Sequence, residues 1–424
     1  MNIAKMRNVE FVVRNELCLS CGTCESVCPS RAIEVKLHCN KGIFIPYIDV
    51  SLCQGCKKCL DFCPGWRVPL KRLSKSFIQT ENESIYLGRF LEVFAGHSQR
   101  VNVLEHASSG GMLTEAVLYL LENKIVDGAL LCRLVTGPTI YGEGYFAFTS
   151  NEVLESQGSK YIPVPINKLI VRAVDSGKSF VFVGLPCHIE ALRMMQDEYK
   201  NLAKTFPYIL GSFCGGIKSI NLIDKMIEAY SLKGQTITHF SFRGGGWPGS
   251  LTIKTSSGNI VSIPYPDYGG DVIEFKTRRC ELCIDGTSEL ADLSFGDAWL
   301  DKYRKTNRGW SSVIARTLKG KDLINELASK NYIYLESLTE EEVIQSQWIN
   351  LESKKKRQKA RRSLFRILGW RVPIYDGGYE ETMTSILFEI KVQISKFLNL
   401  KSEENLHFNK LIILLKFLLK LCKR

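Results

Sequence analysis

Two cysteine runs near the N-terminus have the spacing of a bacterial ferredoxin. CLSCGTCESVCPS and CQGCKKCLDFCPG both read C-x2-C-x2-C-x3-C-P, and 24 residues lie between the last cysteine of the first run, Cys28, and the first of the second, Cys53. In this pattern three closely spaced thiolates bind one cubane, and the fourth, one helical turn later, binds the other cubane. The sequence therefore predicts two 4Fe–4S clusters, the first held by Cys18, Cys21, Cys24 and Cys63 and the second by Cys53, Cys56, Cys59 and Cys28.

A pair of zinc sites is the alternative for these eight thiols. Zinc ribbons use two cysteines per knuckle, so a third cysteine at x2 spacing followed by x3-C-P has no role in them. Pro29 and Pro64, which follow the fourth cysteines, end the local turn and remove a backbone donor. Iron–sulfur ligation is the better prediction.

Four further cysteines are dispersed along the chain. Cys187 and Cys214 each follow an apolar segment and a glycine turn, and each precedes a helical pattern, at 188–196 and 215–230. Strand, turn and helix in this order are typical of βαβ units, whose parallel strands end at one sheet edge. Cys280 and Cys283 add a C-x2-C pair. A structural zinc or merely buried thiols are alternatives, but beside two ferredoxin clusters we predict a third 4Fe–4S cluster.

The remaining sequence must supply the elements that position these thiols. With 424 residues, 45% of them hydrophobic and 24% charged, the composition is that of a globular protein. The predicted fold class is α+β or α/β, with a bacterial-ferredoxin-like domain (1–70), an α/β body (94–345) and a helical, basic tail (346–424). Residues 71–92 resemble a linker. No apolar run reaches the roughly 20 residues needed to span a membrane, and no secretory signal precedes the cysteines, so we expect a cytoplasmic protein.

A glycine turn, Ser108-Ser109-Gly110-Gly111, precedes the helical pattern MLTEAVLYLLENKI. Free backbone N–H groups and the positive end of a helix dipole would make it an anion site. A plain helix N-cap is the alternative. No G-x-G-x-x-G follows a strand, so the turn is not a Rossmann fingerprint.

Six segments occur in an order that resembles the coenzyme F420 hydrogenase/dehydrogenase beta-subunit family: SSGGMLTEAVLYLLENKIVDGALL, GSKYIPV, VGLPCHIEALRMM, GSFCGG, RCELCIDGTSELADLSFGDAW and GWSSVIART. The resemblance covers about 94–320, and a ferredoxin unit is a familiar fusion to it. It implies a flavin-binding N-terminal region at 94–170 and a C-terminal region with the third cluster at 171–345.

The resemblance implies one FAD in the body. The residues that it places at the flavin are Ser109, Gly110, Gly111, Thr114, Ser159, Lys160, Tyr161, Asp292, Gly296 and Asp297. Lys160 would hold a pyrophosphate charge, or else be a solvated lysine. The segment 242–249 departs from the F420-using members and is nearer the chlorophyll-reductase branch, which puts F420 in doubt as substrate. His188 stands where glutamine is common, and we favour an ordinary helix-start role over cluster tuning.

The implied function is that of an iron–sulfur flavoprotein oxidoreductase. It would exchange electrons between a ferredoxin-like partner and a two-electron substrate, either F420-like or another small organic molecule. No Ser–His–Asp set or carboxylate pair stands out, as expected if the flavin does the chemistry. The alternatives are a non-catalytic electron-transfer subunit and a structural metal protein.

The C-terminal part is strongly basic. After residue 350, 17 lysines and arginines stand against 7 acidic residues, of a net charge of +12 for the whole chain. Residues 354–371 are polybasic, and Lys410, Lys416, Lys420 and Lys423 gather opposite a Leu/Ile/Phe arc on a helical wheel. Peripheral contact with the inner membrane surface through 354–424 is one interpretation. We favour a helix packed on the body or on a partner subunit. No nucleic-acid partner is predicted, because aromatics are not interleaved with the charges.

Overall fold

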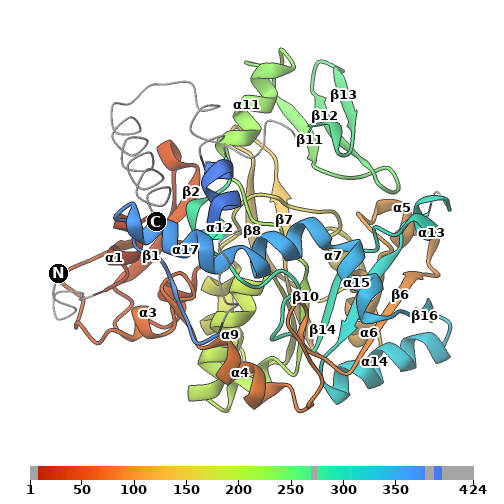
Figure 1. Ribbon diagram of the computed structural model, residues 1–424. Helices are drawn as coiled ribbons and strands as arrows, with labels where there is room; N and C mark the ends of the chain where they lie inside the picture. The colour runs from red at the N-terminus through yellow and green to blue at the C-terminus, as the bar shows by residue number, and fades with distance from the viewer. Residues whose placement is uncertain (1–7, 269–274, 307, 378–385, 394–424) are drawn as a thin grey trace.

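The computed structural model describes residues 8–268, 275–306, 308–377 and 386–393. A ferredoxin-type unit packs against a mixed α/β body (Figure 1) whose centre is an eight-stranded sheet of order β16-β6-β15-β14-β10-β9-β7-β8. The strands are β6 (Glu92–Ser98), β7 (Gly128–Val135), β8 (Tyr141–Ala147), β9 (Phe180–Gly184), β10 (Tyr208–Ser212), β14 (Leu293–Asp297), β15 (Ser311–Ala315) and β16 (Ile333–Ser337).

Four neighbouring strands of this sheet, β7, β9, β10 and β14, run parallel. Strand β15 is antiparallel to both β14 and β6, so β6 runs in the same direction as the parallel group. The expected strands before Cys187 and Cys214 are confirmed as β9 and β10. The helix expected directly after Cys214 begins only at Asn221 (α11, Asn221–Ala229), because the chain first turns at Gly216, whose φ is 116°. The sheet edge that carries Cys187 and Cys214 is also the edge at which β14 and β6 end.

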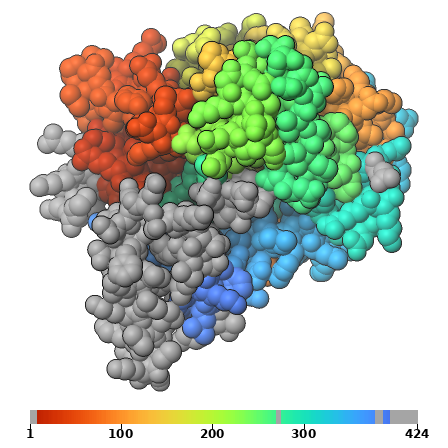
Figure 2. All heavy atoms as spheres, turned by 90° about the horizontal axis from the view of Figure 1, so that it is seen from above, coloured from red at the N-terminus to blue at the C-terminus, as the bar shows by residue number. Residues whose placement is uncertain are grey.

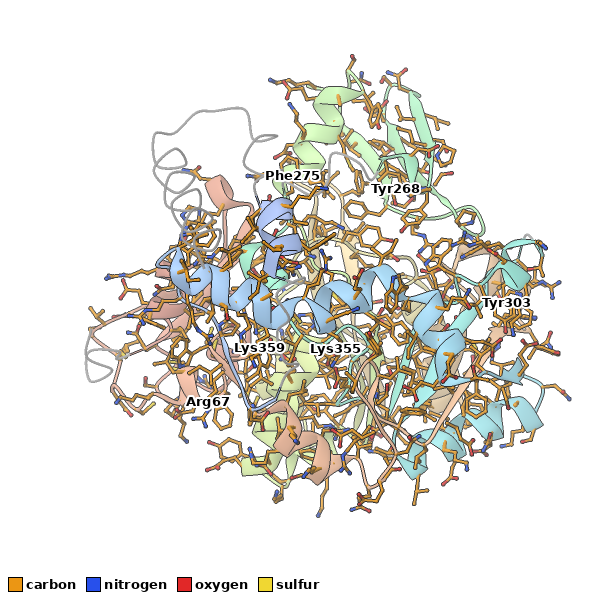
Figure 3. All side chains as sticks on the ribbon, viewed as in Figure 1. Arg67, Tyr268, Phe275, Tyr303, Lys355 and Lys359 are labelled. Carbon is orange, nitrogen blue, oxygen red and sulfur yellow. The ribbon has the colours of Figure 1, made fainter. Side chains whose placement is uncertain are left out.

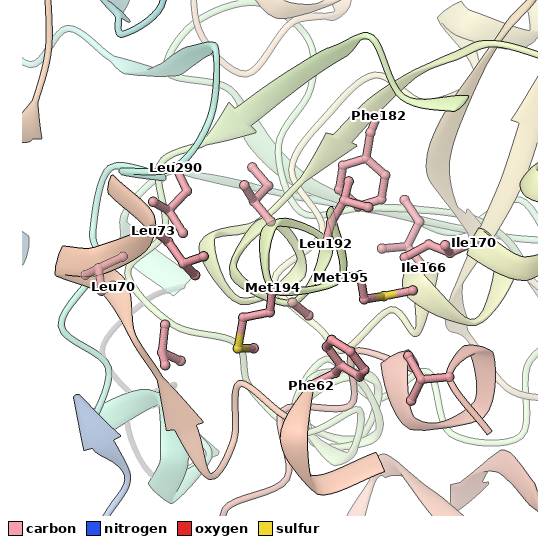
Figure 4. Close-up of a cluster of buried hydrophobic side chains, with 14 of the residues drawn as sticks. Phe62, Leu70, Leu73, Ile166, Ile170, Phe182, Leu192, Met194, Met195 and Leu290 are labelled. Carbon is pink, nitrogen blue, oxygen red and sulfur yellow. The ribbon is translucent and has the colours of Figure 1, made fainter. Parts of the chain in front are cut away.

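Helices cover both faces of the sheet. On one face α6 (Met112–Glu122) and α14 (Leu318–Ser329) share a core with the strands. On the other face α9 (Pro186–Glu198) packs with α4 (Leu70–Phe77) and with the ferredoxin unit. Figure 4 shows Phe62 of the ferredoxin unit beside Met194 and Met195 of α9, with Leu70 and Leu73 of α4 nearby. The ferredoxin unit and the body therefore share one hydrophobic core.

The segment expected to be a linker, 71–92, is part of the body. It forms most of α4 and a short hairpin, β4 (Glu83–Ser84) with β5 (Gly88–Arg89). The side chains of Leu73, Ile78 and Leu87 have no exposed area. The linker prediction was wrong because these few apolar residues stand among polar residues that cover the surface, so the segment reads as hydrophilic.

The ferredoxin unit holds a hairpin, β1 (Ile33–His38) with β2 (Ile43–Ile48), and three short helices, α1 (Glu10–Arg14), α2 (Thr23–Ser26) and α3 (Lys58–Asp61). Val35 and Phe44 of the hairpin pack against Ile220 and Leu222 at α11. Seen from above, the ferredoxin unit borders this green part of the body (Figure 2). Above the sheet edge stands a small sheet, β11 (Ile237–Ser241), β12 (Ser250–Thr255) and β13 (Ile260–Pro264).

The basic segment after residue 345 crosses the body, as Lys355 and Lys359 mark in Figure 3. After the acidic helix α15 (Glu340–Ser346) it comprises α16 (Trp348–Leu351), a π-helical turn η5 (Glu352–Lys356), α17 (Gln358–Ile367) and β17 (Ile374–Tyr375), which pairs with β3 (Arg67–Val68). The side chains of Lys354 and Lys355 are buried, and Lys355 pairs with Glu289. Lys354 and Lys355 are therefore not available to a membrane surface; the segment packs on the body, but with these two lysines inward rather than outward, and contact of the rest of 354–424 with a membrane or a partner stays a prediction.

The helix expected around Lys410–Lys423 lies outside the described residues. Within the described ranges no helix is long and apolar enough to cross a membrane.

Arg316 on the sheet is fully buried and holds several loops together. Its guanidinium donates to the carbonyl oxygens of Leu87, Arg89 and Thr287. Arg316→Met would leave these buried acceptors unpaired, at about 1–3 kcal/mol for each group. We expect the free energy of unfolding to fall by about 3 kcal/mol or more, measured as a lower midpoint in anaerobic thermal denaturation. Arg366→Met, at an exposed site of α17, is the control, and equal midpoints for the two variants would contradict the assignment.

Candidate iron–sulfur and flavin site

The first group of thiols lines one cavity inside the ferredoxin unit. Cys18, Cys21 and Cys24 of the first run surround it together with Cys63 of the second run. Burial raises the pKa of Cys63, and repulsion from the Cys21 and Cys18 thiolates raises it further. The fourth cysteine of the second run thus lies with the first three of the first run, the exchange that the spacing predicts.

The second group of thiols lies at the surface. Burial raises the pKa of Cys59 to about 11, and repulsion from Cys56, Cys28 and Cys53 adds to this. Cys56 is exposed, while Cys53 and Cys28 are half-buried. The two groups in the ferredoxin unit therefore differ in exposure at one ligand, since the second group includes the exposed Cys56 and every thiol of the first is at least half-buried.

The third group collects thiols from three separate segments at the sheet edge. Cys187 begins α9, Cys214 follows β10, and the other two lie in and after α12 (Arg278–Glu281). Burial raises the pKa of Cys187 well above its ordinary value, and Cys21, Cys214 and Cys280 contribute repulsion. Cys283 joins this group, because Lys354 is attracted to Cys283, Cys214 and Cys280 together.

Each group thus offers four thiols, which is the donor set of a cubane cluster. Among the described residues no three Cys, His, Asp or Glu side chains are spaced to hold one metal ion.

Asn167 connects the first and third groups. Its backbone N–H donates to the carbonyl oxygen of Cys21 at 2.9 Å, and its side chain donates to the carbonyl oxygen of His188 at 3.0 Å. His188 Nδ1 accepts from the backbone N–H of Leu185, and burial lowers the pKa of the ring to about 4. The imidazole therefore caps the start of α9, which is the ordinary role that we favoured.

Arg279 makes a second connection, next to Cys280. It is fully buried and donates to the carbonyl oxygens of Gly65 at 2.9 Å and Pro64 at 2.6 Å, and to the hydroxyl of Tyr375 at 2.7 Å. The turn that carries Cys63 is thus fixed to α12. Arg279 directly precedes the first cysteine of the C-x2-C pair, but the sequence analysis gave it no role.

The serine–glycine turn lies at the same sheet edge, at the start of α6. Gly110 N–H donates to Ser311 Oγ at 3.0 Å, and the two hydroxyls of Ser109 and Ser311 are 3.0 Å apart. Gly111, with φ of 73°, precedes the helix, and Thr114 lies in its first turn. Ser311 was missed as a site residue, although GWSSVIART carries it.

The loop 158–161 joins this turn. Ser159 N–H donates to Ser108 Oγ at 2.9 Å. Lys160 Nζ donates to the carbonyl oxygens of Ser156, Gln157 and Gly158, and burial lowers its pKa. The solvated-lysine interpretation is wrong, since the ammonium group ties the loop together from inside.

The loop between β11 and β12 also lies against the serine–glycine turn. Arg243 binds Asp297 through two hydrogen bonds of 2.8 and 3.1 Å, and Trp247 Nε1 donates to the same carboxylate at 3.1 Å. A Cβ on Gly309 would overlap the carbonyl oxygen of Ser109 and lie 3.2 Å from Trp247 Cβ. Three loops and the end of β14 thus converge on the serine–glycine turn. Sequence reasoning gave no role to Arg243 or Trp247.

Asp292 lies away from this surface. It precedes β14, whereas Asp297 ends that strand, so the two lie at opposite edges of the sheet. Its buried carboxylate pairs with Arg193 at 3.1 Å and Lys319 at 3.0 Å and accepts from the backbone N–H of Ile209. The placement of Asp292 on the flavin surface was therefore wrong. Gly296 stays near Asp297, where a Cβ would collide with the Phe213 ring.

Three family models match the chain. Two of them describe the "Coenzyme F420 hydrogenase/dehydrogenase, beta subunit": the N-terminal model matches 93–171, and the C-terminal model matches 177–341. A model of the 4Fe-4S dicluster domain matches 17–65. The chain belongs to the coenzyme F420 hydrogenase/dehydrogenase beta-subunit family.

Named relatives and a solved structure agree with this membership. A subunit of the F(420)H(2) dehydrogenase of Methanosarcina mazei is 26% identical over 318 residues, 72% of this chain and 81% of its own length. The 7-hydroxymethyl chlorophyll a reductase of Oryza sativa is 25% identical over 52% of this chain, which covers 46% of that protein. A chain of the F420-reducing hydrogenase complex from Methanosarcina barkeri superposes with a TM-score of 0.53 over 71% of this chain and 99% of its own, at 19% identity, which shows a shared fold.

The two beta-subunit family models cover different parts of the site. The N-terminal model includes the serine–glycine turn and the loop 158–161, and the C-terminal model includes the third group of cysteines and the loop 243–249. The predicted ferredoxin-type domain and the predicted family are both confirmed. The iron–sulfur character of the chain follows from the dicluster domain, which holds all eight N-terminal cysteines of the two runs.

Proposed function

We propose that this chain is an iron–sulfur flavoprotein subunit that exchanges electrons between a one-electron carrier and a two-electron organic substrate. The observation that carries the proposal is that the three thiol groups follow one another from the protein surface to the sheet edge. Exposed Cys56 belongs to the second group, the first group lines a cavity of the ferredoxin unit, and the third lies at the sheet edge that also carries the serine–glycine turn.

Neighbouring groups in this series are close enough to affect one another. The thiol of Cys24, in the first group, is repelled by Cys59 of the second. Cys187 of the third group is repelled by Cys21 of the first. We assign each group to one 4Fe–4S cluster, with the ligands that the sequence analysis gives. Neighbouring clusters that each carry one electron would form an electron-transfer path between a carrier at the surface and a buried cofactor.

The serine–glycine turn fits a flavin nucleotide. Added Cβ atoms would collide with protein backbone, at Gly110 with β6 and β15 and at Gly309 with Ser109, so glycine at these positions is what lets the turn take its shape. The start of the 11-residue helix α6 favours negative charge. A bound FAD would supply the exchange between electron pairs and single electrons. Ser109, Gly110, Gly111, Thr114, Ser159 and Tyr161 would hold it, with Gly296 and Asp297 at the strand end.

Asp297 would act here as a positioning residue. By accepting from Arg243 and Trp247 it fixes a cation and an indole ring beside the turn. Arg243 also lies over the ring of Tyr265, 4.6 Å from its centroid. This wall of aromatic rings and one guanidinium suits a planar substrate, F420-like or another small organic molecule.

A non-catalytic relay subunit is the second candidate. Its support is that the relatives from Methanosarcina are named as a subunit of a dehydrogenase and as part of a hydrogenase complex. A ferredoxin-like carrier or a larger partner subunit would then exchange electrons at the exposed second group.

Anaerobic purification with iron and flavin analysis tests the proposal. Three clusters predict about twelve irons per chain, since each cubane holds four, together with one FAD. About eight irons without flavin would contradict both the third cluster and the flavin site. Substrate turnover by the isolated chain favours the enzyme, and turnover only with a partner subunit favours the relay.

The different exposure of the two N-terminal groups predicts two phases of iron loss. Solvent access through the surrounding shell controls the attack on a cluster, so an iron chelator should remove about four irons at least roughly tenfold faster than the rest. The measurement is anaerobic iron release followed by chelate absorbance. Cys56→Ala should abolish the fast phase, and uniform release of all iron would contradict the assignment of the exposed group.

A further inference from the structure

Three lysines from separate segments surround the third group of cysteines. Lys218 follows the Cys214 turn, Lys276 precedes α12, and Lys354 lies in the π-helical turn η5. The side chain of Lys354 is only 2% exposed. The other two are half-buried. Three ammonium groups in one partly enclosed region need a negative group close by.

Contacts place Lys276 against the thiols, while the ammonium group of Lys218 lies over the Tyr161 ring, 4.8 Å from its centroid, and is attracted to Cys214 and Cys280. Gly216 N–H donates to Cys214 Sγ at 3.3 Å, and a Cβ on Gly216 would lie 3.1 Å from Lys276 Nζ and 3.2 Å from Cys280 Cβ. Lys276 also forms a β-bridge with Lys218. The Lys276 side chain therefore packs on the turn at Gly216, between Cys214 and Cys280. Lys218 is the backbone neighbour of Lys276 in the β-bridge.

Lys354 approaches from the opposite segment. Its Nζ donates to the carbonyl oxygen of Asp285 at 2.8 Å, and Cys283 Sγ donates to the same oxygen at 3.3 Å. Burial acts to lower the pKa of Lys354, but attraction to Cys283, Cys214, Cys280 and Asp285 together outweighs burial and raises it. The ammonium group of Lys354 is thus stabilised mainly by the cysteines of the third group, with Asp285 adding to them.

Among the described residues none of these three lysines forms an ion pair with a carboxylate within 4.0 Å. The buried ion pairs within the described ranges use other cations, for example Lys355 with Glu289. Three acidic residues face the region: Glu281 acts on Lys276, and Asp285 and Glu190 act on Lys354. Asp285 is bound by backbone N–H groups of its own loop, and burial raises the pKa of Glu190 to about 8. Arg279 adds a further positive charge beside Cys283 and Glu190.

The thiols of the ferredoxin unit have fewer cations. In the first group Lys41 acts on Cys18, and in the second the fully exposed Lys58 acts on Cys56. Exposed charges are screened by solvent and salt, whereas buried ones are screened much less. The electrostatic difference therefore favours extra negative charge at the third group.

We propose that Lys218, Lys276 and Lys354 form a cationic cage that raises the reduction potential of the third cluster above the potentials of the other two. The proposal rests on the third cluster proposed above. Reduction adds one electron to the thiolate-bound cubane, forms or breaks no bond and moves no proton, so the cluster becomes more negative by one charge. Nearby cations stabilise that reduced form more than the oxidised form. The third cluster would then collect electrons beside the flavin site.

An anaerobic redox titration of the full chain, followed by electron paramagnetic resonance, tests the cage. In the parent protein the step at highest potential should integrate to one spin per chain. In Lys354→Met and in Lys276→Met that step should move to lower potential by at least about 59 mV, a tenfold change in the ratio of reduced to oxidised cluster. The two later steps should stay in place. Lys359→Met, at an exposed site of the same basic segment, is the matched control and should change nothing.

Iron analysis separates the possible failures. A full set of about twelve irons with unmoved steps, or a shift in a later step, would overturn the cage alone. About eight irons in the parent chain would overturn the third cluster as well. Where Lys354→Met loses the third cluster, Lys354→Arg decides the matter: retention of iron by the charged variant supports the cage, and equal loss in both variants overturns it.

Discussion

Replacing Cys214 with alanine is expected to remove one complete cluster, lowering the iron content from about twelve to about eight atoms per chain. Cys214 lies on a turn after β10 rather than inside a strand, and its neighbours are the thiols of Cys187 and Cys280. Three remaining thiolates do not close the four-ligand set of the third cluster, while the eight cysteines of the ferredoxin unit are untouched. Iron and acid-labile sulfide analysis after anaerobic purification measures the loss.

The control for this experiment is Cys39→Ala. Cys39 is an exposed thiol between the two cysteine runs and lies in neither. Its replacement should leave the iron content unchanged. If the Cys214 variant kept about twelve irons, the dispersed cysteines would not hold a cluster, although the two N-terminal clusters would stand.

The parts of the site that the sequence predicted depend on short spacings. The C-x2-C-x2-C-x3-C-P runs fix thiols within one or two turns of the chain, and a strand followed by a glycine turn fixes Cys187 at a sheet edge. Local backbone geometry decides both features, so they can be predicted without knowledge of the tertiary fold.

The parts that the sequence did not predict depend on contacts between distant segments. Arg243 meets Asp297 only because the β11–β12 loop folds back over the sheet edge. Lys354 reaches the third group of cysteines because the basic segment crosses the body. A polybasic stretch looks the same in sequence whether its lysines face a membrane, solvent or a buried anionic site. Burial alone distinguishes these, and burial is a property of the fold.

The error at Asp292 has a different physical cause. Asp292 and Asp297 are close in sequence, but they stand at the two ends of β14. At about 3.3 Å per residue, five residues of extended strand separate them by roughly 16 Å. Proximity in sequence therefore placed them on one surface, while the direction of the strand puts them at opposite edges of the sheet.

A second large effect is expected at the serine–glycine turn. In Gly110→Ala the added Cβ would lie 2.7 Å from the backbone nitrogen of Ser311 and would overlap the carbonyl oxygen of Gly96. Neither can move away, because β6 and β15 are paired on both sides in the sheet. The turn must shift instead. Its N–H groups would then lose their alignment with a bound nucleotide.

We therefore expect Gly110→Ala to purify with its full complement of iron but with at most about one tenth of the flavin, and to bind added FAD at least about tenfold more weakly, a loss of about 1.4 kcal/mol. Fluorescence titration with FAD and flavin-to-iron ratios measure this.

Gly137→Ala is the matched control. Gly137 has no positive φ and no neighbour within 4 Å of an added Cβ, so the substitution tests alanine itself at no steric cost. Gly110 also lacks a positive φ, so the collision with β6 and β15, and not backbone strain, distinguishes the effect of alanine at the two sites. Equal flavin binding by both variants, with equal thermal midpoints, would place the flavin elsewhere. A loss confined to Gly110→Ala would instead tie the flavin to the edge of the sheet that also carries the third group of cysteines.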